Sequence, residues 1–150
     1  MKKLAVVLFT IMAAVSCSST KNAPLAKNAD LVSFEYEAIT RGAYKKVTVD
    51  QDSIITIKDR DMKEVFKREL SKADWDVLVA ALDKVNLDTI ETLEPPSTRS
   101  HVDAAMAATL RVIKKDKTYS SNSFDHGNPP AAIKELVTAI IRMSDLRKTK

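Results

Sequence analysis

The chain contains a single cysteine, Cys17, so no disulfide can form within it. A domain without disulfides has to be held together by its hydrophobic core alone. About 134 residues run from Cys17 to the last residue of the sequence, which is long enough to bury one such core. The cysteine also stands directly behind an apolar stretch, and that position gives the clearest functional indication in the sequence.

The apolar stretch belongs to the N-terminal segment MKKLAVVLFTIMAAVSC. Two lysines form a short positive start, and residues 4–15 are almost entirely apolar. At about 1.5 Å per residue, a helix of about a dozen residues is too short to cross a hydrocarbon core of roughly 30 Å. The length matches the apolar region of a secretory signal, which the small residues Ala13, Ala14 and Ser16 then close.

The residues Ala14-Val15-Ser16-Cys17, behind a charged start and an apolar run, resemble the lipobox of bacterial lipoproteins. In that family the cysteine thiol receives a diacylglycerol, the leader is cut before the cysteine, and the new amine is usually acylated. The resemblance implies a signal peptide at residues 1–16 and lipidation of Cys17. The sequence departs from the family pattern at Ala14, where leucine is commoner. The alternative is an ordinary secretory signal in which the cysteine has no role.

Two or three acyl chains on one residue would hold the protein to a membrane, because each buried methylene contributes about 0.8 kcal/mol. Ser18 follows the cysteine, and it is not the aspartate that in enteric bacteria favours retention in the inner membrane. The resemblance therefore implies a location in the cell envelope. If the host is Gram-negative, we expect the outer membrane and its periplasmic face.

The rest of the chain reads as one domain on a tether. Residues 17–30 are small and polar and indicate a flexible connection to the lipid. Residues 31–146 form the expected domain, and residues 147–150 form a basic tail. The chain has 24 Lys and Arg against 20 Asp and Glu, and loss of the leader removes two lysines. This near balance, without a clustered basic face, argues against a nucleic-acid partner.

Strict alternation of apolar and polar residues opens the domain and predicts a half-buried strand. Further short β-rich runs, separated by turn residues, predict an antiparallel meander. Gly42 is one of only two glycines, so we expect its backbone freedom to be needed where the first run breaks. The expected strands cover residues 31–44 with a break near Gly42, 46–50, 53–58 and 62–67.

Two helices are expected to cover this sheet. The first begins at Ser71, whose spacing to Asp74 forms a loose capping box. Its apolar stripe comprises Trp75, Leu78, Val79, Leu82 and Val85. The closing helix follows the turn residues 125–130, and its apolar face comprises Ile133, Leu136, Val137, Ile140 and Ile141.

Between the helices, residues 102–113 and 118–124 predict a hairpin that turns at 114–117, although residues 103–110 also have helical propensity. The predicted fold class is α+β. It consists of an antiparallel β-sheet, built from the meander plus the C-terminal hairpin and covered on one face by two helices.

Both histidines lie beside carboxylates, with His101 close to Asp103 and His126 next to Asp125. Two histidines and two aspartates could together hold a divalent metal ion, and the expected hairpin would bring both pairs near its open end. Neither pair has the i, i+4 helical spacing of a known metal motif. The alternative is that all four are loop residues that cap turns, and no cofactor is expected.

A mixture of aromatic, charged and glycine residues marks residues 40–44, as in a binding cleft. Arg41 and Tyr44 are the candidate binding residues there. The alternatives are an ion pair of Arg41 with Asp103 or Asp125, and packing of the tyrosine ring in the core.

The sequence contains no G-x-S-x-G, no H-E-x-x-H and no phosphate-cradling glycine loop. The layout of residues 31–143 resembles small envelope lipoproteins of Bacteroidetes-type bacteria, a resemblance that implies no activity. We therefore expect a lipid-anchored, non-catalytic module that binds another envelope protein or another component of the envelope. The alternatives are a metal-dependent, hydrolase-like site formed by the two His–Asp pairs, and a periplasmic inhibitor or small-ligand binder that uses Arg41 and Tyr44.

Overall fold

The computed structural model describes residues 31–147, and the side chain of Arg147 is not part of the description. The predicted signal peptide, Cys17 with its tether, and the last residues of the basic tail lie outside the described residues. Within the described part of the chain, no helix is long and apolar enough to cross a membrane.

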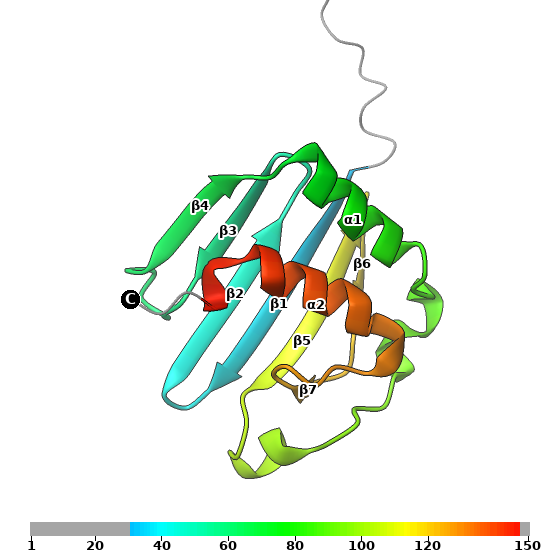
Figure 1. Cartoon of the computed structure of the whole chain (residues 1–150). Helices are drawn as coiled ribbons and strands as arrows, with labels where there is room; N and C mark the ends of the chain where they lie inside the picture. The colour runs from blue at the N-terminus through cyan, green and yellow to red at the C-terminus, as the bar shows by residue number, and fades with distance from the viewer. Residues whose placement is uncertain (1–30, 148–150) are drawn as a thin grey trace, which may run out of the picture.

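One antiparallel sheet of seven strands forms the framework (Figure 1). Its order is β4-β3-β2-β1-β5-β6, and β7 pairs with the part of β5 that β6 leaves free. The central strand β1 therefore pairs with both β2 and β5 along most of its length. The strands are β1 Val32–Thr40, β2 Ala43–Val49, β3 Ser53–Ile57, β4 Val65–Glu69, β5 Ala107–Lys114, β6 Lys117–Ser120 and β7 Phe124–Asp125.

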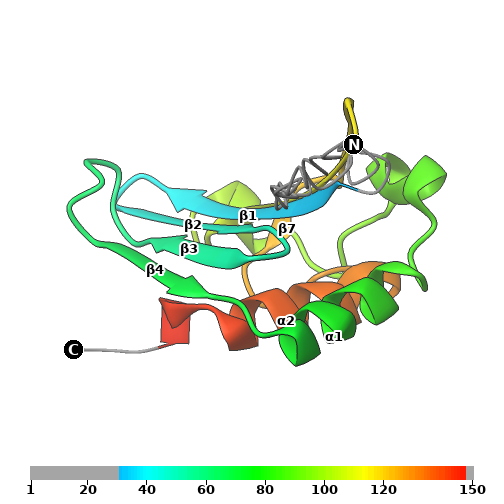
Figure 2. The same cartoon turned by 90° about the horizontal axis from the view of Figure 1, so that it is seen from above.

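Two α-helices cover one face of this sheet and leave the opposite face without a helix (Figures 1 and 2). They are α1 Lys72–Leu82 and α2 Lys134–Met143. Short 3₁₀ turns complete the connections, namely η2 Leu87–Thr92, η3 Arg99–Val102, η4 Ala131–Ile133 and η5 Asp145–Arg147. The α+β class and the placement of both helices on one face confirm the sequence prediction.

The hydrophobic core lies between the sheet and the two helices. Alternate residues of β1 supply its centre, where Phe34, Tyr36 and Ala38 are fully buried. The helices contribute the apolar positions that the 3.6-residue period predicts, including Leu78 of α1 and Leu136 of α2. A continuous core of this kind replaces the disulfides that the domain lacks.

The start of α1 is fixed by its capping residue. Ser71 has an extended backbone, and its hydroxyl accepts a hydrogen bond from the backbone N–H of Asp74 at 3.1 Å. This bond satisfies one of the amides that the first turn of a helix leaves without a partner. One turn later, the ring of Trp75 packs against Phe34, with ring centroids 5.8 Å apart. Through this contact Trp75, a member of the predicted apolar stripe, anchors α1 on the sheet.

Strand β4 begins later than the expected residue 62. The carboxylate of Asp59 accepts hydrogen bonds from the backbone N–H groups of Lys63 and Glu64, and Met62 adopts a positive φ of 55°. This turn occupies the chain up to Glu64, so pairing with β3 starts only at Val65.

The expected hairpin of residues 102–113 and 118–124 is present but interrupted. Strand β5 starts at Ala107, because η3 ends in Asp103 with a left-handed φ of 56°. The helical alternative for residues 103–110 is wrong. On the return strand, the Ser121 hydroxyl accepts the backbone N–H of Leu110 at 3.1 Å. A side chain there takes the place of a ladder carbonyl, so β6 and β7 form separate strands.

Candidate functional site

A tight turn after β7 positions the residues that the sequence singled out at 125–127. The backbone N–H of Asn128 donates to the carbonyl of Asp125 at 2.8 Å. Gly127 has a φ of +86°, which is strained for any residue with a side chain. Glycine is therefore required at this turn, and His126 is held at the position just before it.

Gly42 does not have this property, and the expectation that its freedom is needed is wrong. Its φ is not positive, and a Cβ added to it would meet no heavy atom within 4 Å. The turn between β1 and β2 does not depend on glycine.

Asp125 is a structural anchor. Its carboxylate accepts hydrogen bonds from the Ser97 hydroxyl at 2.5 Å and from the backbone N–H groups of Arg99 at 3.0 Å and Ser100 at 2.7 Å. These bonds, the one from Ser97 foremost, hold the pKa of Asp125 well below its usual range. The side chain ties the loop before η3 and the first residues of η3 to β7, and the residue is only 3% exposed.

His126 is bound to the core through Tyr36. The Tyr36 hydroxyl lies 2.7 Å from His126 Nδ1. Burial raises the pKa of Tyr36, so its hydroxyl keeps its proton. Nδ1 is the one acceptor that the described residues offer to this buried O–H, so we assign the O–H as the donor, which corresponds to a neutral imidazole protonated at Nε2. Burial, and then the positive charge of Lys45, lower the pKa of His126.

A cavity of about 360 Å³ opens beside this histidine, between β2, α2 and the 125–128 turn. We call it the α2–β2 cavity. Its lining residues are Lys45, His126, Gly127, Thr138, Ile141 and Leu146. The sequence pattern identified His126 and Gly127 as turn residues, but it gave no signal for Lys45 or Tyr36, which read only as strand positions.

The four residues proposed for a metal site are divided between two places. Asp125 and His126 belong to the turn just described, whereas His101 and Asp103 are exposed in and after η3. Asp103 forms an ion pair with Arg41, with 3.6 Å between Oδ2 and Nε. Among residues 31–147, no three His, Cys, Asp or Glu side chains are grouped so as to hold a metal ion.

Arg41 and Tyr44 do line one cavity, of about 340 Å³, between the β1–β2 turn and the 58–61 turn. Its charged groups are already engaged. Arg41 pairs with Asp103, and Arg60 donates to the carbonyl of Thr40 at 2.9 Å. Asp59 accepts the two amides that build its own turn. This region joins two turns and offers few groups for a ligand.

The sheet face without helices, which we call the open sheet face, carries an ordered set of charges. Glu35 lies between Lys46 at 3.1 Å and Arg111 at 3.4 Å, and Arg111 also lies 3.4 Å from Glu37. Tyr44 also lies on this face, where partial burial and then the carboxylate of Glu37 raise the pKa of the tyrosine. Tyr44 is therefore a surface residue of the sheet, and its packing in the core was a wrong alternative.

An apolar patch adjoins these charges on the open sheet face. Residues that pair across two strands share a face of the sheet, and so do residues two apart on one strand. Tyr44 is two residues from Lys46 and pairs with Ile39, so both lie on the face of Lys46. Ile57 pairs with Lys46 and with Val65, which places these two residues on the same face. Ile39 and Val65 are 37% and 46% exposed. We define the apolar patch as Ile39, Tyr44, Ile55, Ile57 and Val65.

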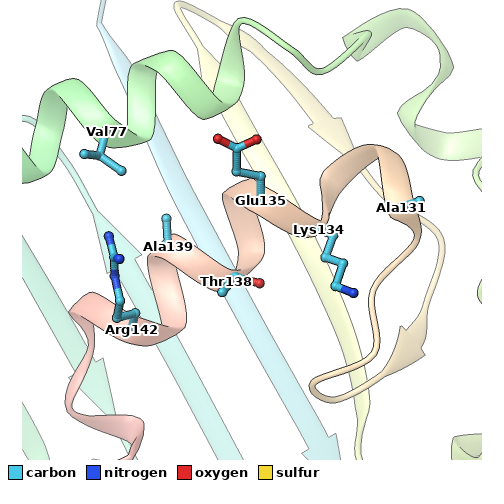
Figure 3. A pocket seen from close by; sticks show the side chains of 7 residues that line it. All are labelled: Val77, Ala131, Lys134, Glu135, Thr138, Ala139 and Arg142. Carbon is cyan, nitrogen blue, oxygen red and sulfur yellow. The ribbon is translucent and has the colours of Figure 1, made fainter.

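A groove of about 550 Å³ runs between α1 and α2 on the opposite side of the molecule (Figure 3). Lys134, Thr138 and Arg142 line it from α2, and Val77 lines it from α1. At one end, Lys84 donates to both carboxylate oxygens of Glu135 at 2.8 and 2.9 Å. This ion pair links the turn that follows α1 to the first turn of α2.

Comparison with known protein families, curated proteins and solved structures gave no match to this chain.

Proposed function

We propose that the protein is a lipid-anchored, non-catalytic domain of the cell envelope that binds a protein partner through its open sheet face. The anchor is inferred from the sequence. A charged start, an apolar run of secretory length and the residues Ala14–Cys17 together resemble a lipobox. Lipid on Cys17 would keep the domain beside the membrane, within reach of other envelope proteins.

The observation that carries the binding function is the composition of the open sheet face. The solvent face of an antiparallel sheet is ordinarily polar. Here the five residues of the apolar patch adjoin a fixed set of four charges, namely Glu35, Glu37, Lys46 and Arg111. An apolar centre beside oriented polar groups is the usual anatomy of a protein–protein interface. A broad face of this composition suits a protein partner better than a small molecule, which usually binds in a deep, enclosed pocket.

The roles of the candidate catalytic residues also support a binding function. The carboxylate of Asp125 is occupied by the hydrogen bonds that hold the 97–100 loop. Asp103 is engaged by Arg41 on the surface. Both aspartates of the proposed hydrolase-like site therefore serve the structure of loops.

Mass spectrometry of the mature protein tests the anchor. We expect an N-terminus at Cys17 that carries acyl chains, and loss of membrane association in a Cys17→Ser variant. An unmodified sulfur, or a variant that still fractionates with membranes in high salt, would overturn this part of the proposal.

Capture of partners from the native envelope tests the binding face. The substitution Ile57→Glu places a charge in the apolar patch, and Val77→Glu places the same charge on the helix layer, where Val77 is 43% exposed. We expect a partner that wild type and Val77→Glu recover and that Ile57→Glu loses, with circular dichroism showing all three folded. Equal recovery by both variants would contradict the assignment of the open sheet face.

A further inference from the structure

The α2–β2 cavity carries a separate inference, because it combines a cation, a polar hydrogen and an apolar wall. Lys45 pairs with Ala38 across β1 and β2, so its side chain leaves the sheet on the helix-covered face. Ala38 is small and fully buried there. Lys45 is half-buried as a residue, and its side chain lines the cavity.

Lys45 makes no ion pair with any residue in the described part of the chain. A cation that is partly removed from water is ordinarily compensated by an anion, because burial of an isolated charge is costly. The polar end of the cavity is thus suited to a negatively charged group.

His126 adds a hydrogen-bond donor of fixed direction. Tyr36 occupies Nδ1 at 2.7 Å, which leaves Nε2–H as the imidazole donor without a partner among residues 31–147. Tyr36 is fully buried and Gly127 holds the turn, so the ring has little freedom to reorient. His126 and Lys45 line the same cavity.

The remaining wall is apolar. Ile141 of α2 and Leu146 of η5 line it, and Thr138 adds one hydroxyl. A volume of about 360 Å³ lies at the lower end of the range for small-molecule sites. One cation suits a singly charged anion better than a phosphate, which usually requires several donors and charges.

We propose that the α2–β2 cavity binds a small monocarboxylate with a short apolar chain. Lys45 and Nε2–H of His126 hold the carboxylate, and Ile141 and Leu146 contact the chain. This site is independent of the open sheet face, because it lies on the helix-covered side of the sheet.

Titration of the full-length protein with hexanoate, followed by NMR of the His126 ring and the isoleucine methyl groups, tests the proposal. We expect saturable shifts at His126 and Ile141. Lys45→Met should weaken binding about tenfold through loss of a charge-assisted hydrogen bond, whereas Lys45→Arg should retain most of it. The control Lys134→Met removes a lysine that lines the groove between α1 and α2, and it should bind as wild type does.

Two further probes test which part of the ligand is recognised, since hexan-1-ol lacks the carboxylate and inorganic phosphate lacks the apolar chain. The proposal requires that hexanoate binds more tightly than either probe. It is overturned if hexanol binds equally well, if phosphate is preferred, if Lys45→Met binds hexanoate as wild type does, or if the shifts cluster at the groove between α1 and α2.

Discussion

Tyr36 and His126 lie 90 positions apart in the sequence, and a single hydrogen bond of 2.7 Å joins them in the core. Each residue limits the other. Burial raises the pKa of the tyrosine, while burial and then the charge of Lys45 lower the pKa of the histidine. At the scale of single residues, this pair gives the α2–β2 cavity a donor of defined direction and makes the stability of the domain depend on pH.

The pH dependence has two separate windows. The pKa of His126 in the folded state lies below the usual value of about 6.5, so the unfolded chain binds more protons. The free energy of unfolding should therefore fall as the pH drops below about 6.5. Asp125 has a lowered pKa as well, so its stabilising contribution is complete above the usual carboxyl value of about 3.9 and is lost only at lower pH. Chemical denaturation at a series of pH values measures both windows.

The substitution Tyr36→Phe tests the part of this pH dependence that comes from His126. It removes the O–H that favours neutral Nδ1, so the pKa of His126 should rise toward its usual value. NMR titration of the imidazole measures the change, and Tyr119→Phe, a half-buried tyrosine on β6, is the control that should leave it unaltered. An unchanged His126 titration in Tyr36→Phe would show that the hydrogen bond has no influence on the histidine.

The two glycines should respond oppositely to alanine. Gly127→Ala forces a side chain into a φ of +86° and should lower the free energy of unfolding by about 1–2 kcal/mol. Gly42→Ala meets open space at an ordinary φ and should be neutral or stabilising, by up to about 1 kcal/mol. Urea denaturation of both variants checks this, and a comparable loss of stability in both would contradict the turn analysis.

Some contacts of single residues could be predicted from the sequence, and others could not. The cluster Asp125-His126-Gly127 was recognisable as a turn from composition alone, and the ion pair of Arg41 with Asp103 was one of the stated alternatives. Neither Lys45 nor Tyr36 could be linked to His126 from the sequence, because strand periodicity reports which face a residue occupies and not which distant turn it meets. The hydrogen bonds to Asp125 from the 97–100 loop were unpredictable for the same reason.

At the scale of elements, the sequence pattern predicted the strands and helices better than it predicted where strand pairing begins and ends. Alternation placed β1, β2 and β3 within a few residues of their bounds, and helical periodicity with the Ser71 cap placed α1. The predicted strand bounds were wrong where a side-chain oxygen, and not a backbone carbonyl, accepts a backbone N–H. The carboxylate of Asp59 accepts two backbone N–H groups in the turn before β4, so β4 begins later in the sequence than expected. The Ser121 hydroxyl accepts a backbone N–H of β5, and this bond lies between β6 and β7. Such substitutions depend on contacts that periodicity does not contain.

The cap of α1 gives a prediction at this scale. Ser71→Ala removes the acceptor for the N–H of Asp74 and should cost about 1 kcal/mol of stability. Ser123→Ala, in the exposed loop between β6 and β7, should cost much less and serves as the control. Denaturant midpoints of the two variants provide the comparison, and equal midpoints would mean that α1 is positioned by Trp75 and the core alone.

At the scale of the whole molecule, the two faces of the sheet differ in composition and in what covers them. The helix-covered face supplies the core and the α2–β2 cavity, while the open sheet face combines the apolar patch with the charges of Glu35, Glu37, Lys46 and Arg111. A domain of this kind on a lipid tether would present one broad surface to its neighbours in the envelope. The central claim is that this surface is where the partner binds.

Site-specific photo-crosslinking in the native envelope tests that claim most directly. A photoreactive residue at Thr48, in the middle of the open sheet face, is compared with one at Thr138, exposed on α2. We predict one discrete crosslinked protein from position 48 that disappears in the Ile57→Glu background, and no such product from position 138. A product from position 138 alone, or one from position 48 that persists with Ile57→Glu, would contradict the account.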